Sequence, residues 1–438
     1  MRVAFVYNEV PNRDHSTDTY CAYLLLEALA EAGHEVTAFL LLDDAVALGD
    51  PATRDRWLEE LAQLDIDIRV TPVSSPRQPL PRGVQRVRTL LRPRLEEHFP
   101  HVALGERLEA ELVPLRPDVV VTWGNWPAVA AASVTRQAPK YAFVGDPPHL
   151  PGLFRQRPPF TDARGFSARR LVFRLRMRNL ARMTVELLSR FDAVAATAAH
   201  HAEWLRSRGV RGCVYRPNVV PDWGGGDWQE RRRAAGLAPH KPKAVVVGHV
   251  ATTSNLSGLD FLAREVLPAL EQELGEDGFE VHVCGGGTLP SWLEQLLDRP
   301  SVRLRGFVDD IVGEIFSADA FVVATPIELG IRVRIPYAWS TGACVVVHEA
   351  NRAGLPELSD GRNALLSSDG VAMARDLARA LTDSDLRSRV GLEGRRTYEA
   401  RFAPEVTKAI FLEDLERLAA RNVEGSRLAP EVVRDSVR

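Results

Sequence analysis

Short apolar runs alternate with amphipathic segments along most of the chain. Residues 2–7 and 35–42 form two such runs, and residues 19–32 between them place apolar side chains at helical spacing. Short apolar runs bounded by helical segments predict buried strands of a parallel sheet that is covered on both faces. A second series of the same kind includes apolar runs at 244–247, 280–284, 320–324 and 344–347. The pattern therefore predicts an α/β protein with two Rossmann-like domains.

Residues 321–347 connect a buried strand, a helix and a further buried strand. Gly330 interrupts the chain after the first strand, and Arg332 and Arg334 follow before the apolar turns of the helix. In such a loop main-chain N–H groups are free and the helix dipole favours an anion, while guanidinium groups pair with phosphate oxygens. These residues predict either a diphosphate site or an ordinary βαβ unit with solvated arginines.

The sequence GIRVRIPYAWSTGACVVV in this stretch resembles the donor-site segment of GT-B glycosyltransferases of the "glycosyl transferases group 1" type. That segment typically runs Gly-x-Arg/Lys-x-Arg/Lys-x-x-Glu-Ala, followed by a glycine and a Val-Val pair. The positions that match are Gly330, Arg332, Arg334, Ala338, Gly342 and residues 345–347. Tyr337 stands where the family carries a glutamate expected to contact the nucleotide ribose, and Glu328 lies one residue too early for the usual pair of glutamates.

Other short motifs in the second half of the chain occur in the same order as in this family. They are Gly-His and Asn at 248–255, a triple glycine at 285–287 and Arg-x-Gly-Phe-Val-Asp-Asp at 305–310. The triple glycine permits close approach of the backbone to a ligand, although any sharp turn uses glycine as well. The basic residues that many members carry after the first strand of this half are absent, and His249 and Thr252 occupy that loop.

The first half places polar loops at the ends of its predicted strands, on the edge where open α/β sheets bind ligands. The loop 8–18 carries Asp18-Thr19 where the family often has a glycine pair, and it lacks GxGxxG, which argues against a dinucleotide. The loop 145–149 carries Asp146 and His149. We predict that these two residues act on a hydroxyl or hold a sugar; the alternative is a Pro-rich turn with an exposed histidine.

A basic stretch covers residues 155–190. Its arginines alternate with apolar residues, and its acidic residues are only Asp162 and Glu186. A basic amphipathic helix can lie on an anionic membrane. It can equally be a solvated helix with one face on the core, and charge runs are usually solvated.

Composition and charge further limit the number of domains and the classes of partner. A chain of 438 residues with 45% hydrophobic and 26% charged residues is expected to form two globular domains of roughly 200 residues each. The net charge of −3 gives no general attraction to nucleic acid. The four cysteines lack CxxC spacing, which predicts buried free thiols and no zinc site. The amino terminus resembles a first strand, and no apolar stretch is long enough to span a membrane.

The resemblance implies the GT-B fold. We expect an acceptor domain at 1–220, a linker at 221–243, a donor domain at 244–402, a helix at 403–422 that crosses back to the first domain, and a mobile tail at 423–438.

The implied activity is transfer of a sugar from a nucleoside diphosphate sugar to an acceptor hydroxyl, with retention and without a metal or cofactor. The acceptor is a glycan, a lipid-linked intermediate or a small molecule. The expected catalytic residues are Asp146 and His149, and the expected donor-binding residues are Gly330, Arg332, Arg334, Glu328, Tyr337, Gly286 and His249.

Two other functions stay open: a degenerate nucleotide-sugar-binding subunit, because Tyr337 replaces the glutamate, and a sugar-nucleotide epimerase. A cytoplasmic location is expected, with peripheral contact at the inner face of the membrane through residues 155–190.

Overall fold

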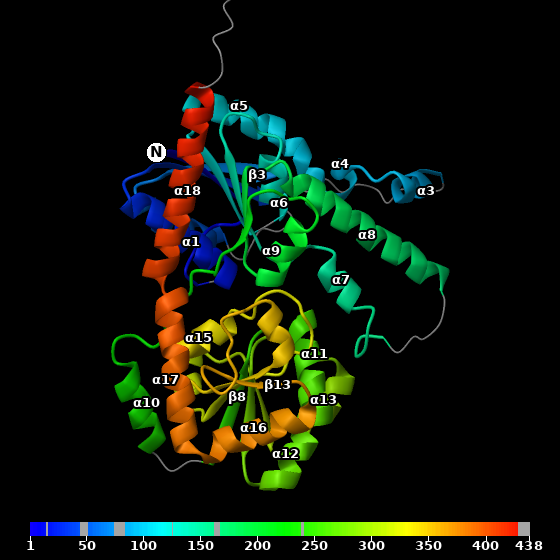
Figure 1. The fold of residues 1–438 in the computed structure, drawn as a ribbon, viewed down its shortest axis with the longest axis vertical. Helices are drawn as coiled ribbons and strands as arrows, with labels where there is room; N and C mark the ends of the chain where they lie inside the picture. Colours follow the sequence, from blue (N-terminus) through cyan, green and yellow to red (C-terminus); the bar gives the residue numbers. More distant parts are fainter. Residues whose placement is uncertain are drawn as a thin grey trace, which may run out of the picture.

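The computed structural model describes residues 1–14, 16–43, 51–73, 84–124, 126–161, 167–237 and 241–427. These residues form two domains, each a parallel sheet with helices on both faces, and the two domains lie one above the other in Figure 1. The α/β class and the GT-B arrangement predicted from the sequence are therefore confirmed.

The first sheet has seven strands in the order β3-β2-β1-β4-β5-β6-β7. Their bounds are β1 Arg2–Tyr7, β2 Glu35–Asp43, β3 Asp67–Val73, β4 Val119–Gly124, β5 Lys140–Val144, β6 Ala193–Ala196 and β7 Cys213–Tyr215. The helices of this domain are α1 Thr17–Glu31, α2 Pro51–Ala62, α3 Val84–Leu91, α4 Leu95–His98, α5 Gly105–Leu115, α6 Trp126–Ala132, α7 Leu150–Phe154, α8 Ala168–Leu188 and α9 Ala199–Arg206. The strand order reverses beside β1, which places a ligand crevice at the carboxyl ends of the strands.

The second sheet has six strands in the order β10-β9-β8-β11-β12-β13. Their bounds are β8 Lys243–Val247, β9 Glu280–Cys284, β10 Val302–Gly306, β11 Ala320–Val323, β12 Val345–His348 and β13 Leu365–Ser367. The helices are α10 Trp228–Leu237, α11 Thr253–Phe261, α12 Leu267–Leu274, α13 Ser291–Leu297, α14 Ile311–Phe316, α15 Arg334–Ser340, α16 Gly370–Thr382, α17 Ser384–Arg401 and α18 Pro404–Arg427. Here the order reverses between β8 and β11.

Each central strand is buried on both faces, which explains its continuous apolar run. In β1, Ala4 and Val6 belong to one hydrophobic cluster, whereas Val3 and Phe5 belong to the cluster on the opposite face. Burial of such side chains on two faces is the main stabilisation of a parallel α/β sheet, at about 25 cal/mol for each Å² of apolar surface removed from water.

Helix α18 crosses back to the first domain, as expected, and Figure 1 shows it running along that domain beyond α17. Phe411 and Leu415 on this helix are buried in the cluster that also holds Phe5. The Asp414 carboxylate accepts hydrogen bonds from Arg216 Nε at 2.7 Å and from Tyr141 Oη at 3.2 Å. Apolar packing and buried polar contacts thus fix the last helix on a domain that is distant in sequence.

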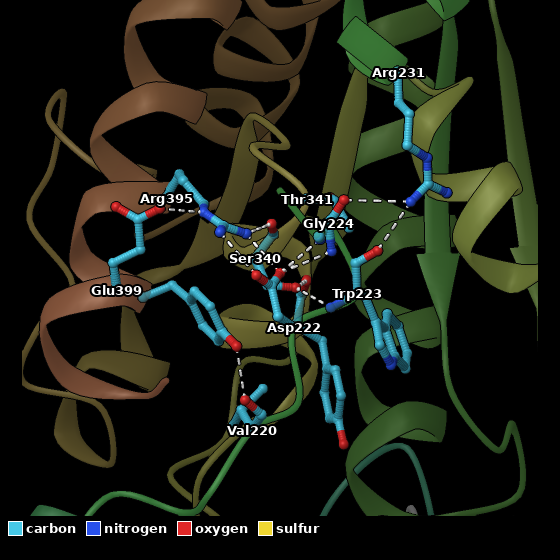
Figure 2. Close-up of polar contacts among 12 residues, drawn as sticks. Val220, Asp222, Trp223, Gly224, Arg231, Ser340, Thr341, Arg395 and Glu399 are labelled. Atoms are coloured by element: carbon cyan, nitrogen blue, oxygen red, sulfur yellow. Dashed lines mark hydrogen bonds and ion pairs between the residues drawn. The ribbon is translucent and has the colours of Figure 1, made fainter. Parts of the chain in front are cut away.

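The segment between the domains is held by α17 (Figure 2). The Asp222 carboxylate accepts hydrogen bonds from Arg395 Nη1 at 2.6 Å and Nη2 at 2.8 Å, and from the main-chain N–H groups of Gly224 and Gly225 at 3.0 Å each. The main-chain N–H of Trp223 donates to Ser340 Oγ at 3.2 Å. A bidentate arginine–carboxylate pair of this kind fixes both distance and orientation.

Several elements differ from the sequence predictions. The pattern of residues 84–98 predicts one helix, but these residues form α3 and α4 because Pro93 between them interrupts the helical hydrogen bonds. The expected linker contains α10, and β3 was not predicted. Helix α18 continues to Arg427, past the expected start of the mobile tail, and residues 428–438 lie outside the described residues.

The structure also bears on the predictions about the cysteines and about membrane-spanning segments. The four cysteines are free and buried, as expected. Among the described residues, no helix has the length and apolarity needed to cross a membrane.

Candidate active site

The carboxyl ends of the two sheets meet at the domain boundary. The main-chain N–H of Ala199, after β6, donates to the carbonyl oxygen of Gly354, after β12, at 3.2 Å. Arg155 Nε, beyond α7, donates to Thr253 Oγ1 in α11 at 2.8 Å. Loops that were predicted to lie at strand ends are therefore brought together from both domains.

Asp146 is the acidic residue at this meeting point. It follows β5, and its carboxylate lies against the Cα of Gly330, where a Cβ would collide with both oxygens. Its Oδ1 lies 3.7 Å from Nδ1 of His201. Burial raises the pKa of Asp146, whereas Arg332 and then His200 act to lower that pKa. Asp146 and Gly330, which were predicted separately, thus form one site.

Two histidines complete this site and were missed in the sequence analysis. The rings of His200 and His201 lie 4.0 Å apart, and both nitrogens of each ring are buried without a hydrogen-bond partner among the described residues. Burial, with smaller effects from neighbouring cations, lowers the pKa of His201 to about 3, so its ring is neutral near pH 7. Both residues lie just after the carboxyl end of β6, and the sequence alone does not show that this end lies beside Asp146.

The two predicted arginines have different surroundings. Nε and Nη2 of Arg332 are buried without a partner in the described part of the chain, and burial lowers the pKa of this guanidinium. Arg334 is bound within the protein: Nη1 donates to the Val247 carbonyl at 2.9 Å and to Asn255 Oδ1, and Nη2 donates to Thr325 Oγ1 at 3.0 Å. Among the described residues, Arg332 therefore has two nitrogens without a partner, whereas Arg334 has only Nε without one.

The other predicted donor residues lie around this centre. Glu328 and His249 are exposed, and Gly286 has open space where a side chain would be. The His249 ring packs against Gly287, whose φ of +105° is a conformation that favours glycine. Gly286 accepts a hydrogen bond from the main-chain N–H of Val250 at 3.0 Å. The triple glycine thus brings the loops after β8 and β9 into contact.

Tyr337 lies on the interior side of α15. Its ring is only 5% exposed and lies 4.1 Å from the ring of Trp223 at an angle of 35°. Its hydroxyl forms a hydrogen bond with Thr17 at the start of α1, and burial raises its pKa. The residue that replaces the expected glutamate therefore joins the interdomain segment and the first domain.

His149 is also buried, which differs from the exposed histidine of the alternative prediction. It is 5% exposed, and its Nδ1 has no hydrogen-bond partner within the described ranges. Its ring lies 5.2 Å from that of Trp204 in α9. Burial lowers the pKa of His149 to about 4, with Arg208 acting in the same direction.

Asp18 lies in the first turn of α1, where the family often has a glycine pair. Its Oδ2 accepts a hydrogen bond from Tyr7 Oη at 3.0 Å, and its Oδ1 accepts one from Trp123 Nε1 at 3.0 Å. Burial raises the pKa of this carboxyl group. Asp18 therefore links the ends of β1 and β4 through hydrogen bonds, which is a structural role.

A separate cavity of about 590 Å³ lies between α10, α14 and α17, near Asp319 and Cys344. It is at the amino ends of β11 and β12, on the edge opposite to the ligand-binding edge. Its Arg232 donates to the carbonyl oxygens of Ile315, Phe316 and Ala318. A guanidinium that is satisfied by main-chain oxygens is structural, so we place the active site at the Asp146–Arg332 cluster instead.

Residues 241–383 match the model of the family Glycosyl transferases group 1. No curated protein matches the sequence.

Among solved structures, sucrose-phosphate synthase from Thermosynechococcus elongatus superimposes with a TM-score of 0.65 at 16% identity, over 96% of this chain and 99% of that chain. HepE from Anabaena, in complex with UDP, gives 0.63 at 15% identity, over 95% and 100%. A variant of TarM from S. aureus, in complex with fondaparinux, alpha-GlcNAc-glycerol and UDP, gives 0.61 at 10% identity, over 94% and 99%.

The whole chain has the GT-B fold of these solved structures, and its second domain matches a glycosyltransferase family model. Residues 241–383 of the second domain are similar to the family Glycosyl transferases group 1.

Proposed function

We propose that this protein transfers a sugar from a nucleoside diphosphate sugar to an acceptor hydroxyl, with retention and without a metal ion. The observation that carries the proposal is Arg332, whose Nε and Nη2 are buried and without a partner in the described structure. A buried charged donor without a partner is costly, and a diphosphate oxygen supplies the missing acceptor. The complexes of HepE and TarM with UDP support a nucleoside diphosphate as the ligand.

The reaction breaks the bond between the anomeric carbon and the diphosphate oxygen, so negative charge grows on the leaving group. A guanidinium that is already in place stabilises that charge without reorganisation. We assign this task to Arg332. Arg334 holds the loop after β11 against Val247 and Asn255, and thereby positions Arg332 two residues earlier.

The acceptor side of the reaction falls to the first domain. Asp146 and His201 lie close to Gly330, at the point where the two domains meet. A neutral histidine both donates and accepts a hydrogen bond, and a carboxylate accepts one from a hydroxyl group. We assign to these residues the orientation of the acceptor hydroxyl and of the reacting end of the donor.

The proposal is tested by incubating the purified protein with a panel of nucleotide sugars and analysing the products. Donor hydrolysis or sugar transfer, with the same rate after addition of EDTA, is the expected result. Interconversion of the sugar nucleotides would instead identify an epimerase, and loss of activity with EDTA would overturn the metal-free mechanism.

A second candidate function is a nucleotide-sugar-binding subunit without turnover. The observation that favours it is the burial of Tyr337 against Trp223, at the position where the family has a glutamate. Tight binding of a nucleotide sugar without any product would support this second function.

A peripheral contact with an anionic membrane is a wider proposal for the same enzyme. Arg169, Arg174, Arg178 and Arg182 on α8 are exposed, and Figure 1 shows this helix extending away from the body of the first domain. Exposed arginines are attracted to anionic lipids in a salt-dependent manner. Sedimentation with phosphatidylglycerol vesicles, but not with phosphatidylcholine vesicles, is the corresponding test.

A further inference from the structure

A groove of about 690 Å³ lies between α7, α8 and α9, next to the candidate active site. Its apolar wall includes Met177, Met183 and Trp204. Its rim includes Arg174, Arg178 and Arg182, which are exposed and follow one another at intervals of four residues. Residues four apart share one face of a helix, so the three guanidinium groups lie along the same side of the groove.

The charge of this groove is mainly positive. Arg208 adds a fourth cation, and its guanidinium lies over the Trp204 ring at 4.5 Å from the ring centre. Glu186 is the acidic group of the lining, and it is paired with Arg190 at 3.6 Å. Arg174, Arg178 and Arg182 form no ion pair with another described residue. Several cations beside an apolar wall suit a ligand that carries an anion next to an apolar portion.

A second observation comes from His149, which also lines the groove. Its side chain is 95% buried, since 5% of its surface is exposed, and Nδ1 has no partner among the described residues. A buried polar atom of this kind costs free energy unless a ligand or a water molecule satisfies it. The groove therefore has a buried imidazole in its wall as well as cations at its rim.

The groove adjoins the proposed reaction centre. His149 and Asp146 belong to the same loop after β5. On α9, Trp204 lines the groove and His201, one helical turn earlier, lies 3.7 Å from Asp146. A molecule in the groove thus has its inner end beside the residues to which we assign the acceptor hydroxyl.

We propose that this groove binds the acceptor, and that the acceptor is an amphiphile with a phosphate group joined to an apolar chain. This inference rests on the proposed glycosyltransferase function. The arginines of α8 bind the phosphate, and the methionines and Trp204 contact the apolar chain. The proposal concerns a single amphiphilic molecule and not the surface of a membrane.

The test is calorimetric titration of the full chain with dodecyl phosphate below its micelle concentration, without any donor present. We expect saturable binding that weakens with salt and that is at least about tenfold tighter than binding of inorganic phosphate, because the apolar wall contributes. Arg178→Glu should weaken dodecyl phosphate by roughly tenfold or more, which corresponds to loss of one charged hydrogen bond. Arg169→Glu changes the same residue type in the first turn of α8, outside the groove, and should leave the affinity within about twofold.

The outcomes separate this inference from the proposed function. Equal affinities of the Arg178→Glu and Arg169→Glu variants, or no binding of dodecyl phosphate, would overturn the groove proposal even if UDP binds. Binding to phosphatidylglycerol vesicles alone would replace it with a membrane surface. Groove binding together with no binding or turnover of any nucleotide sugar would show an amphiphile-binding groove but would refute the glycosyltransferase function, and with it the role of the groove as an acceptor site. Both arginines are exposed, so equal melting temperatures will show that each variant is folded.

Discussion

Gly330 of the second domain and Asp146 of the first are in direct contact, and a side chain at residue 330 would collide with the Asp146 carboxylate. Gly330 follows β11 and Asp146 follows β5, and these strands belong to different sheets. Residue 330 has a φ of +63°, so its backbone conformation also favours glycine. The glycine of the family segment thus fits both its own turn and the approach of the other domain.

Replacement of Gly330 by alanine should therefore impair activity beyond its effect on stability. The positive φ should cost about 1–2 kcal/mol of unfolding free energy. The new Cβ should also displace Asp146 and reduce turnover strongly. Gly361→Ala is a matched control, because Gly361 has a φ of +67° and open space around it. Similar losses of melting temperature in both variants, with loss of turnover only in Gly330→Ala, are expected; equal turnover would remove the contact from the mechanism.

The two arginines of the segment should respond differently to substitution. Arg332→Ala should weaken binding of a nucleoside diphosphate by about 1.5–3 kcal/mol, because it removes a charged hydrogen bond. Arg334→Ala should mainly destabilise the fold, by about 1–3 kcal/mol, since it leaves the Val247 carbonyl and the Asn255 and Thr325 side chains without their donor. Calorimetry and thermal unfolding measure the two effects. Unchanged nucleotide affinity in Arg332→Ala would contradict the assignment.

The histidines predict how stability depends on pH. The pKa of His201 is lowered to about 3 in the folded protein, whereas an unfolded histidine titrates near 6.5. Between these values the unfolded state binds more protons, so His201 should lower stability as the pH falls below about 6.5, with a slope of at most about 1.4 kcal/mol per pH unit.

His201→Gln should remove that slope. The expected result is a flatter dependence of melting temperature on pH between 7 and about 4.5 in this variant than in the wild type. His249→Gln, at an exposed position, is the control and should keep the wild-type slope. If the His201 variant and the wild type lose stability in parallel, another group causes the acid sensitivity.

Tyr337 should be important for stability as well as for the donor site. Loss of its buried ring and of the contact with Trp223 should make Tyr337→Ala less stable by about 3–5 kcal/mol. A double mutant with Trp223→Ala should lose less than the sum of the single losses, because the two rings share one contact. Thermal unfolding of the three variants measures this coupling, and strictly additive losses would show that the stacking is not important.

The same position distinguishes the two candidate functions. If Tyr337 recognises the donor, as we expect, Tyr337→Glu should weaken nucleotide binding. If the ring instead blocks a degenerate site, the glutamate that the family carries should create or strengthen binding. New turnover in Tyr337→Glu would therefore favour the non-catalytic subunit.

The sequence was sufficient for the fold because local pattern and spatial arrangement coincide in parallel α/β domains. Each apolar run between 244 and 347 is a strand that is buried on both faces, so its prediction needed no knowledge of distant residues. Strand β3 was missed because it lies at the edge of its sheet, where Asp67 and Val70 are exposed and the apolar run is broken.

The site was only partly predictable for the opposite reason. The sequence does not distinguish Arg332 from Arg334, because both fit the same motif. Only Arg334 donates hydrogen bonds to Val247, Asn255 and Thr325, and these contacts form only in the folded chain. His200 and His201 became candidates only when the end of β6 was placed beside Asp146. The burial of His149 likewise depends on Trp204, which no motif connects to it.

The bidentate pair between Arg395 and Asp222 fixes the segment between the domains, and this limits how the domains can move. Val219 belongs to the first domain, since its carbonyl oxygen accepts a hydrogen bond from Cys21, whereas Val220 is bound to α17 through Tyr398 Oη at 2.9 Å. The main-chain N–H of Val220 also donates to the Phe402 carbonyl at 3.2 Å, just before α18 returns to the first domain. The two covalent connections between the domains are thus joined to each other at one point. Any rotation of one domain against the other therefore pivots near this point, and it changes the separation of Asp146 and Gly330, which belong to different domains.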